Sequence, residues 1–370
     1  MGQFTKTVVG LDVHKETIAV SVLPGWSERA TETFVAPNQP KVIEKLVNRV
    51  CAKDPAVFVY EAGPCGYEVH RQVTGLGQEC QVVAPGLIPV RATDRVKTDR
   101  RDAEKLARLW RAGELTAIRV PTREEESARD LVRVREDVLQ DRLRHRNRLS
   151  KFLLRQGRVF RESGAWTSRH QEWVKGQRFD IPFLEQAFEG HRRAWEEAEA
   201  RLAALNQQVV DMAATDPYRT RVAYLRCLKG IDTLSAMTLV VEIQEFRRFS
   251  RATRLMKFTG LTPSEYSSGG SVRRFGIAKA GNAHVRRVLV EAAWCYRRPN
   301  VTGATLIKRR EGCPAAVVQL ARKTQDRLHR RFHRLALRGK PLGVAAAAIA
   351  RELSGFVWAM AQHFPEETSV

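Results

Sequence analysis

The sequence predicts a mixed α/β domain followed by a mostly helical remainder. Over about residues 1–120, short β-branched and apolar runs alternate with amphipathic helical patterns, which is typical of an α/β sheet domain. After residue 123 the apolar spacing is mostly helical and extends over long stretches. At 370 residues the chain exceeds the usual length of one domain, so we expect two or three units.

The first region opens with a predicted β-hairpin in TKTVVGLDVHKETIAVSVL, where apolar residues run to Asp12 and resume after a polar turn. Helical spacing follows in QPKVIEKLVNRVCA and GYEVHRQVTGLG, and buried-type strands in AVFVYEAGP and CQVVAP. KTDRRDAEKLARLWRAG predicts a helix with Thr98 as its N-cap and Gly113 as its end. We therefore place one α/β domain at residues 1–120.

The second region, residues 121–218, contains two long helical patterns. The first runs from Arg123 to about Phe160 and the second from about Phe183 to Ala214, with an irregular stretch between them. They can pair as an antiparallel coiled coil. The first is acidic at its start and basic later, which complements the helix dipole, so part of this polarity is structural. Its excess of basic residues predicts a stripe that faces nucleic acid, formed by Arg142, Arg144, Arg146, Arg148, Lys151 and Arg155.

The third region, residues 219–370, is again mostly helical. LRCLKGIDTLSAMTLVVEI resembles a helix-hairpin-helix element, whose turn at Lys229 and Gly230 would offer backbone N–H groups to a phosphate. Asp232 stands where such turns usually carry a second glycine. A predicted loop rich in Ser, Gly and Arg then leads into a helix. Further candidates for nucleic-acid binding are Arg273, Arg274, Lys279, Arg286 and Arg287.

Charge and cysteine content limit the class of protein. The chain has 63 Lys+Arg against 41 Asp+Glu, a formal net charge of +22, so nucleic acid is the favoured partner. The alternative is a basic surface that only keeps the chain dissolved. Six scattered cysteines without a C-x-x-C pair argue against a zinc site and against a disulfide framework. With no signal-peptide pattern and no apolar run of roughly 20 residues, we expect a cytoplasmic protein without a membrane span.

Two acids, Asp99 and Asp102, lie three residues apart among arginines at the start of one predicted helix. Carboxylates at this spacing share a helix face and repel one another unless a cation lies between them. The cation is either a neighbouring arginine or a metal ion.

Asp12 and Glu61 each end a predicted strand, and strand ends beside a helix start can converge at one edge of a sheet. Mg²⁺ prefers oxygen ligands, and a pair of such ions can activate an attacking oxygen and stabilise a leaving one. Taken singly, each acid is an ordinary surface residue, but the four together favour a metal site. His14, just after Asp12, could contact a phosphate or lie on the plain surface.

In chain order, GLDVHK, YEAGP, KTDRRDA and GLTPSEYSSGG with FGIAKAGNAHVRR resemble the DEDD-type transposases of insertion sequence family 110, also known as bridge-RNA-guided recombinases. The resemblance covers about residues 7–300. It implies a RuvC-like (RNase H-type) N-terminal domain whose acidic set binds Mg²⁺. By motif, these positions are Asp12, Glu61, Asp99 and Asp102.

The resemblance also implies a serine nucleophile in YSSGG that forms a covalent phosphoserine link to DNA. The candidates are Ser267 and Ser268, with Ser264 and Ser271 as nearby hydroxyls. The implied partners are donor and target DNA, a noncoding guide RNA that pairs with both, and further copies of the chain in dimers and tetramers. The prediction is an RNA-guided DNA recombinase that works at the bacterial nucleoid.

Three other functions remain open from the residues. A RuvC-like nuclease that uses water would need the four acids and no serine. An inert nucleic-acid-binding protein would keep the architecture and need no metal. A sugar-kinase-like ATPase opens with a similar strand and aspartate, but no glycine-rich phosphate loop follows Asp12 here.

Overall fold

The computed structural model describes residues 6–89, 98–162, 164–268 and 271–365. Within these ranges it describes every side chain except those of residues 87, 266–268 and 271–274. The chain divides into two compact units, Met1–Pro121 and Thr122–Val370. Each unit has its own hydrophobic cores.

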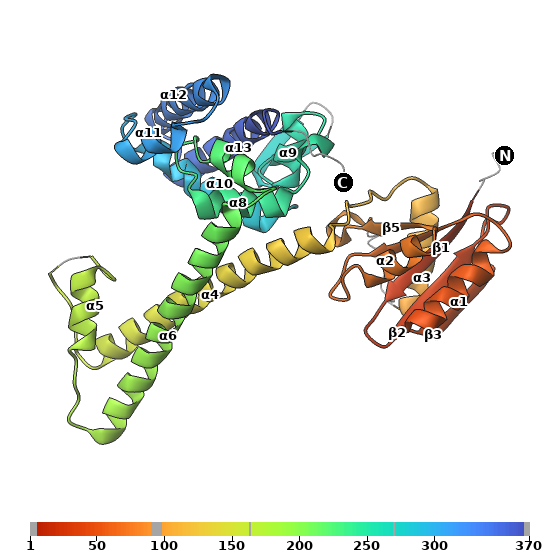
Figure 1. The fold of residues 1–370 in the computed structure, drawn as a ribbon, viewed down its shortest axis with the longest axis horizontal. Coiled ribbons are helices and arrows are strands. Elements are labelled where there is room, and N and C mark those ends of the chain that lie inside the picture. Colours follow the sequence, from red (N-terminus) through yellow and green to blue (C-terminus); the bar gives the residue numbers. More distant parts are fainter. Residues whose placement is uncertain (1–5, 90–97, 163, 269–270, 366–370) are drawn as a thin grey trace. The chain divides into compact units, whose positions relative to one another are not determined.

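A five-stranded sheet in the order β3-β2-β1-β4-β5 forms the centre of the first unit (Figure 1, red and orange). β1, β2 and β3 are antiparallel neighbours, whereas β4 and β5 run parallel to β1. The elements are β1 (Thr7–Val13), β2 (Thr17–Leu23), β3 (Glu32–Pro37), α1 (Pro40–Cys51), β4 (Ala56–Glu61), α2 (Glu68–Gly75), β5 (Glu79–Val83), the 3₁₀ turn η1 (Pro85–Leu87) and α3 (Asp99–Arg111).

Helices cover both faces of this sheet. Successive strand residues point to opposite faces, and the paired residues Val9 and Phe58 belong to the core that contains α1 and α2. The next pair, Val8 and Val57, belongs to the core on the other face, against α3. The first unit is therefore a three-layer α/β structure, which confirms the predicted α/β class of this region.

The second unit begins with two long helices, α4 (Arg123–Arg155) and α6 (Pro182–Ala213), with the short α5 (Ser168–Lys175) between them. Thr122 caps α4, and a capping box with Glu125 fixes its start. The first turns of α4 and the last turns of α6 share one hydrophobic cluster. The end of α4 and the start of α6 share another cluster with α5. The two helices therefore lie antiparallel (Figure 1, yellow and green).

A body of shorter helices completes the second unit. Its largest core combines α8, α10, α12 and α13 with the adjoining ends of α4 and α6. The elements are α7 (Arg219–Leu225), α8 (Thr233–Ile243), η2 (Phe246–Arg248), α9 (Ala252–Phe258), β6 (Pro263–Ser268), β7 (Ser271–Ile277), α10 (Ala283–Trp294), η3 (Cys295–Arg297), α11 (Ala304–Arg310), α12 (Ala315–Leu337) and α13 (Leu342–Ala361).

Helix α13 is long and apolar enough, by length and composition, to cross a membrane. Half of the most apolar 18-residue segment of α13 is buried inside the protein. Ile349, Leu353 and Val357 are fully buried in the core of the second unit. The core helix of a globular protein meets the same criteria, so α13 is explained by packing.

Three segments of the chain differ from the predictions. The segment Glu32–Pro37 forms the edge strand β3, although no strand was predicted there. Part of the stretch expected to be irregular between the long helices is α5. The Ser- and Gly-rich segment predicted as a loop is instead an antiparallel hairpin, β6 and β7. Backbone pairing across this hairpin satisfies N–H and C=O groups that an open loop would leave to water.

Candidate active site

Asp12 and Glu61 lie at the same edge of the sheet. β1 and β4 are parallel neighbours with Leu11 opposite Tyr60, and each acid is the next residue of its strand. Parallel strands bring their carboxyl ends to one edge, which places both acids there as predicted. Asp12 is half-buried and Glu61 is exposed.

A glycine brings helix α3 against β1. A Cβ atom on Gly10 would lie 1.9 Å from the Ala103 carbonyl oxygen and 2.9 Å from the Ala107 nitrogen, so a side chain at Gly10 cannot be accommodated without moving α3. Thr98 caps the helix by accepting a hydrogen bond from the Arg101 backbone N–H, and Gly113 follows its end with φ +71°, as predicted.

Asp99 lies in the first turn of α3 and meets Asp12 across His14. The His14 Nε2 atom lies 3.3 Å from Asp12 Oδ2 and 3.6 Å from Asp99 Oδ1. One possible ligand atom from each of these three residues lies within 4.8 Å of the other two. Asn38 donates a hydrogen bond from its side chain to the His14 backbone carbonyl and supports the turn.

The pKa of the Asp12 carboxyl is raised, mainly because burial disfavours its charged form. His14 opposes this shift, whereas the negative charges of Asp99 and Asp102 add to it. Asp102 is therefore close enough to act on Asp12. Asp99 and Asp102 thus both disfavour the charged form of Asp12.

The donor set of two carboxylates and one imidazole fits a divalent cation, since carboxylate oxygens suit hard ions and imidazole suits several transition ions. A cation there would relieve the repulsion around Asp12. Within the described residues, Glu61 and Asp102 are not part of the 4.8 Å cluster. His14 is the member that the sequence left open, and the signal for it was its place in the turn directly after the strand-ending aspartate.

The serine candidates lie on the hairpin of the second unit. The backbone at Ser267 and Ser268 belongs to β6, opposite Val272 and Ser271 of β7. Their side chains, and those of Arg273 and Arg274, lie outside the described side chains. Ser264 donates a hydrogen bond to the Gly276 carbonyl across the hairpin.

The predicted basic stripe on α4 separates into two groups. Arg142 and Arg146 form ion pairs with Glu199 of α6, and the Arg146 guanidinium lies 4.8 Å from the centroid of the Trp166 ring. These two arginines hold the helix pair together. The other four side chains of the stripe are exposed: Arg144, Arg148, Lys151 and Arg155.

The predicted helix-hairpin-helix turn makes contacts with other parts of the second unit. Lys229 donates to the Pro299 carbonyl, and burial lowers the pKa of its ammonium. Gly230 has φ +88° and lies against Ala292, whose carbonyl oxygen would be 2.6 Å from a Cβ atom. Asp232 caps α8 by accepting from the Ser235 backbone N–H.

The remaining basic candidates border helix α10. Arg286 donates to the backbone carbonyls of Thr259 and Lys279, and Lys279 itself is exposed with φ +56°. Arg287 pairs with Glu136 of α4. These contacts leave Lys279 as the exposed candidate of the three.

The chain has a net charge of +22 and gathers carboxylates at one edge of its sheet. Both features are typical of proteins that use a metal ion to act on nucleic acid. Comparison with known proteins is more specific. Residues 9–156 match a family described as "Transposase", of the DEDD type of IS110, and residues 222–306 match the "Transposase IS116/IS110/IS902 family".

Two relatives cover almost the whole chain. The protein named "Putative transposase y4qE" of Sinorhizobium fredii (strain NBRC 101917 / NGR234) is 38% identical over 100% of this chain and 92% of its own. The "Transposase for insertion sequence element IS1533" of Leptospira borgpetersenii is 34% identical over 91% of this chain and 99% of its own. The chain therefore belongs to the IS110 family of transposases, which confirms the resemblance inferred from its motifs.

Family membership establishes the general activity. Transposases of this family are enzymes that cut and rejoin DNA, and a DEDD-type transposase uses a divalent metal.

Proposed function

We propose that this transposase is a Mg²⁺-dependent DNA recombinase that works through a covalent phosphoserine intermediate and is guided by a noncoding RNA. The observation that carries its metal-dependent part is the convergence of Asp12, His14 and Asp99 at the end of β1, and the serine and RNA parts rest on the motif resemblance. Clustered carboxylates without a cation repel one another, so their convergence favours a role in metal binding.

In this proposal the first unit, residues 1–120, is a RuvC-like domain of RNase H type. The sheet order β3-β2-β1-β4-β5, with one antiparallel and one parallel side, supports the assignment. Asp12, Glu61, Asp99 and Asp102 would hold Mg²⁺. The metal would supply Lewis-acid stabilisation of the phosphate oxygens during strand cleavage.

Ser267 or Ser268 would act as the nucleophile. Its Oγ attacks a DNA phosphorus, so that a serine–phosphate bond forms and one phosphodiester P–O bond breaks. The released DNA oxygen takes up the proton that the serine loses. Attack by a hydroxyl of another strand reverses these steps and rejoins the DNA. The hairpin supports this role, because both serines belong to its strand β6, in backbone register with Val272 and Ser271 of β7.

The basic residues would hold the nucleic-acid backbones, while base pairing with the guide RNA selects donor and target sites. This division suits a chain that carries many arginines and no recognisable base-reading motif. The exposed side chains Arg144, Arg148, Lys151 and Arg155 are the best placed for phosphate contacts.

The long helices, within residues 121–218, would also join copies of the chain into dimers and tetramers, and residues 219–370 would form the transposase domain. Two large apolar side chains at the start of α6 support a contact there, because Ile181 is 62% exposed and Phe183 is 82% exposed.

The alternative is a structure-specific nuclease that uses water as its nucleophile. One observation favours this nuclease: every residue of the carboxylate cluster lies within the first unit, and hydrolysis by water would need no serine from the second unit.

A denaturation-resistant adduct tests the choice. The protein is incubated with Mg²⁺, DNA and RNA transcribed from beside its gene, and the products are resolved under denaturing conditions. We expect a protein–DNA adduct that is lost when Ser267 and Ser268 are both changed to Ala and when Asp12→Asn is made. Cleavage that survives the double serine change but not Asp12→Asn would establish the water-using nuclease instead.

A further inference from the structure

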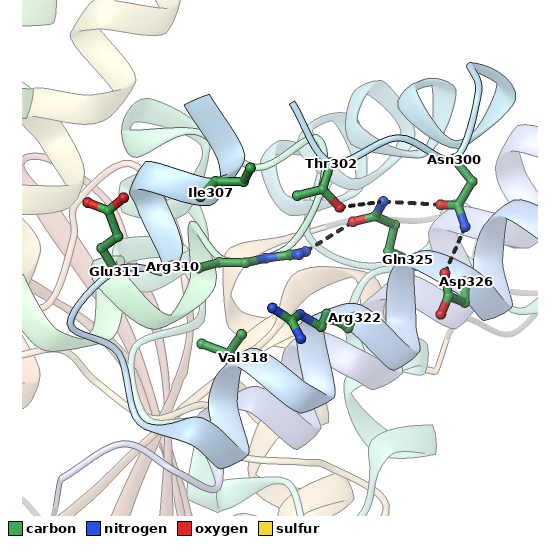
Figure 2. Close-up of a pocket in the computed structure, with 9 residues that line it drawn as sticks. All are labelled: Asn300, Thr302, Ile307, Arg310, Glu311, Val318, Arg322, Gln325 and Asp326. Atoms are coloured by element: carbon green, nitrogen blue, oxygen red, sulfur yellow. Dashed lines mark hydrogen bonds between the residues drawn. The ribbon is translucent and has the colours of Figure 1, made fainter. Parts of the chain in front are cut away.

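An open cavity of about 510 Å³ lies in the second unit between α11, the residues just before it, and α12 (Figure 2). It is remote in sequence from both the carboxylates and the serine hairpin. Its lining combines charged, polar and apolar side chains of these segments.

Arg310 is a buried cation with neutral partners. Its side chain is only 7% exposed, and it donates to the Cys227 carbonyl from Nε and to the Gln325 side-chain oxygen from Nη2. Among the described residues, no carboxylate pairs with it and its Nη1 has no hydrogen-bond partner. A buried charge without a counter-ion is costly, because neutral hydrogen bonds replace only part of its hydration. An anion in the cavity would offset this cost.

A second cation faces the same space. Arg322 of α12 lines the cavity, is exposed, and forms no ion pair with any residue that the structure describes. Burial lowers the pKa of the Arg310 guanidinium and the charge of Arg322 lowers it further, whereas Cys227, Tyr296 and Asp326 act in the opposite direction. The two guanidinium groups are therefore close enough to repel one another.

Neither acid of the lining forms an ion pair with Arg310 among the described residues, although the charge of Asp326 acts on it. In Figure 2, Glu311 and Asp326 are at opposite ends of the view, and the guanidinium groups of Arg310 and Arg322 lie between them. Asp326 already accepts a hydrogen bond from the Asn300 side chain at 2.7 Å. The centre of the cavity is thus the positive part of its lining.

Beside the arginines is a preformed set of amide and hydroxyl groups. Gln325, 3% exposed, donates to Asn300 Oδ1 at 3.1 Å and to Thr302 Oγ1 at 3.3 Å. These contacts fix Gln325 and, through it, Arg310. The apolar side chains of Ile307 and Val318 complete the wall. Polar groups that can bond a base edge, next to apolar groups that can cover a ring face, suit a nucleobase.

We propose that this cavity binds one unpaired nucleotide of a nucleic-acid strand, with its phosphate held by Arg310 and Arg322 and its base placed against Asn300 and Thr302. The volume falls within the range of about 300 to 1,000 Å³ that is usual for small-ligand pockets, and exceeds what a bare phosphate needs. The proposal rests on the proposed function, in that it assumes a chain that handles single strands. It requires neither Mg²⁺ nor the serine chemistry.

Photocrosslinking tests it on the full-length protein. Single-stranded 12-mers carrying 4-thiothymidine (DNA) or 4-thiouridine (RNA) are bound in EDTA, irradiated and mapped by mass spectrometry. We expect crosslinks in the peptides that span residues 300–326. Arg322→Gln should weaken them about tenfold, because it removes a charge-assisted contact and, being exposed, should leave the fold intact. Arg334→Gln, on an exposed part of the same helix away from the cavity, should leave them unchanged.

The absence of crosslinks in these peptides, or an equal loss with Arg334→Gln, would overturn the proposal. So would a competition assay in which inorganic phosphate reduces the crosslinks as strongly as a nucleoside monophosphate does. The DNA and RNA arms assign the nucleotide to a DNA strand or to the guide. Because the assay is run without metal, it can fail while the adduct test succeeds, and the reverse also holds.

Discussion

Gly10 of β1 and Ala103 of α3 meet backbone to backbone: a Cβ atom on Gly10 would lie 1.9 Å from the Ala103 carbonyl oxygen. The strand carries Asp12 two residues later, and the helix begins with Asp99. The close approach of the two backbones therefore sets the distance between the two carboxylates.

Gly10→Ala should break this arrangement. The new methyl group would meet backbone atoms that cannot turn aside, so we expect a loss of at least about 3 kcal/mol in unfolding free energy, at the upper end of overpacking changes. Metal-dependent cleavage should fall with it. Urea denaturation measures the unfolding free energy, and a DNA-cleavage assay measures the activity. Gly75→Ala is the control, because nothing lies within 4 Å of its Cβ position; equal stability of the two variants would contradict this account of α3.

Mg²⁺ should stabilise the wild-type protein. Binding to the native state alone adds RT ln(1 + [L]/Kd), or about 2.7 kcal/mol at a hundredfold excess over Kd. Asp99→Asn should remove this gain with little effect on the metal-free protein, since Asp99 is exposed. Thermal denaturation with and without Mg²⁺ measures it. Asp54→Asn, an exposed acid away from the cluster, should keep the full gain. A gain that persists in Asp99→Asn would place the metal elsewhere.

His14→Ala should weaken metal binding. Its imidazole lies 3.3 Å from Asp12 and 3.6 Å from Asp99, so its loss removes either a ligand or a group that orients one. Changes of this kind lower metal affinity by about 10- to 100-fold. Mn²⁺ titration by calorimetry would measure the affinity. His363→Ala, on an exposed histidine of the second unit, should leave it unchanged.

Glu242→Gln should destabilise the second unit. The Glu242 side chain is 1% exposed and receives two hydrogen bonds from Arg133 of α4 and one from Asn282. Burial alone would raise the pKa of Glu242, but Arg133 and Asn282 hold it below its usual value of 4.5. Because Arg133 remains 40% exposed and can turn to water, we expect a loss of about 2 kcal/mol, less than for a fully buried pair.

The sign of the pH dependence follows from that lowered pKa. A carboxyl with a depressed folded-state pKa stabilises the protein above pH 4.5, and this contribution disappears as the pH falls through the folded-state value. The difference in unfolding free energy between wild type and Glu242→Gln should therefore be largest near neutral pH and shrink below about pH 4.5. A difference that is constant between pH 7 and pH 3.5 would show that charge on Glu242 is not its cause.

Exposed and paired arginines of α4 should behave differently. Changing Arg148 and Lys151 to Gln together should weaken DNA binding without changing stability. The slope of log K against log salt should fall by about one for each of the two side chains that binds a phosphate in the wild type. Arg146→Gln should instead destabilise the helix pair, because Arg146 pairs with Glu199 and covers Trp166. Filter binding at several salt concentrations, with thermal denaturation of each variant, separates the two effects.

Local signals explain what the sequence could predict. Thr98 and Gly113 mark the two ends of α3, and the strands of the first unit carry β-branched runs. β3 was missed because its residues are alternately half-buried and exposed at the edge of the sheet, which leaves only a weak apolar signal. The hairpin of residues 263–277 was predicted as a loop, because its Ser- and Gly-rich composition is that of a turn, whereas cross-strand pairing decided its structure.

Side-chain partners far apart in sequence were harder to predict. The charge of the α4 stripe was evident, but Arg142 and Arg146 share an acid, Glu199, that lies more than 50 residues away on another helix. For the same reason the role of His14 depended on where Asp99 would lie. Composition predicts which charges exist, and only the fold assigns their partners.

The antiparallel helices α4 and α6 carry a hydrophobic cluster at each end. One cluster includes Val132 and the other Leu153, about 30 Å apart at the rise of an α-helix. Because the far cluster is built only from α4, α5, α6 and the segments that join them, it can melt while the larger core stays intact. We therefore expect unfolding of the second unit to depart from a single all-or-none transition. Hydrogen exchange, which follows each segment separately, would describe its stability better than any single transition midpoint.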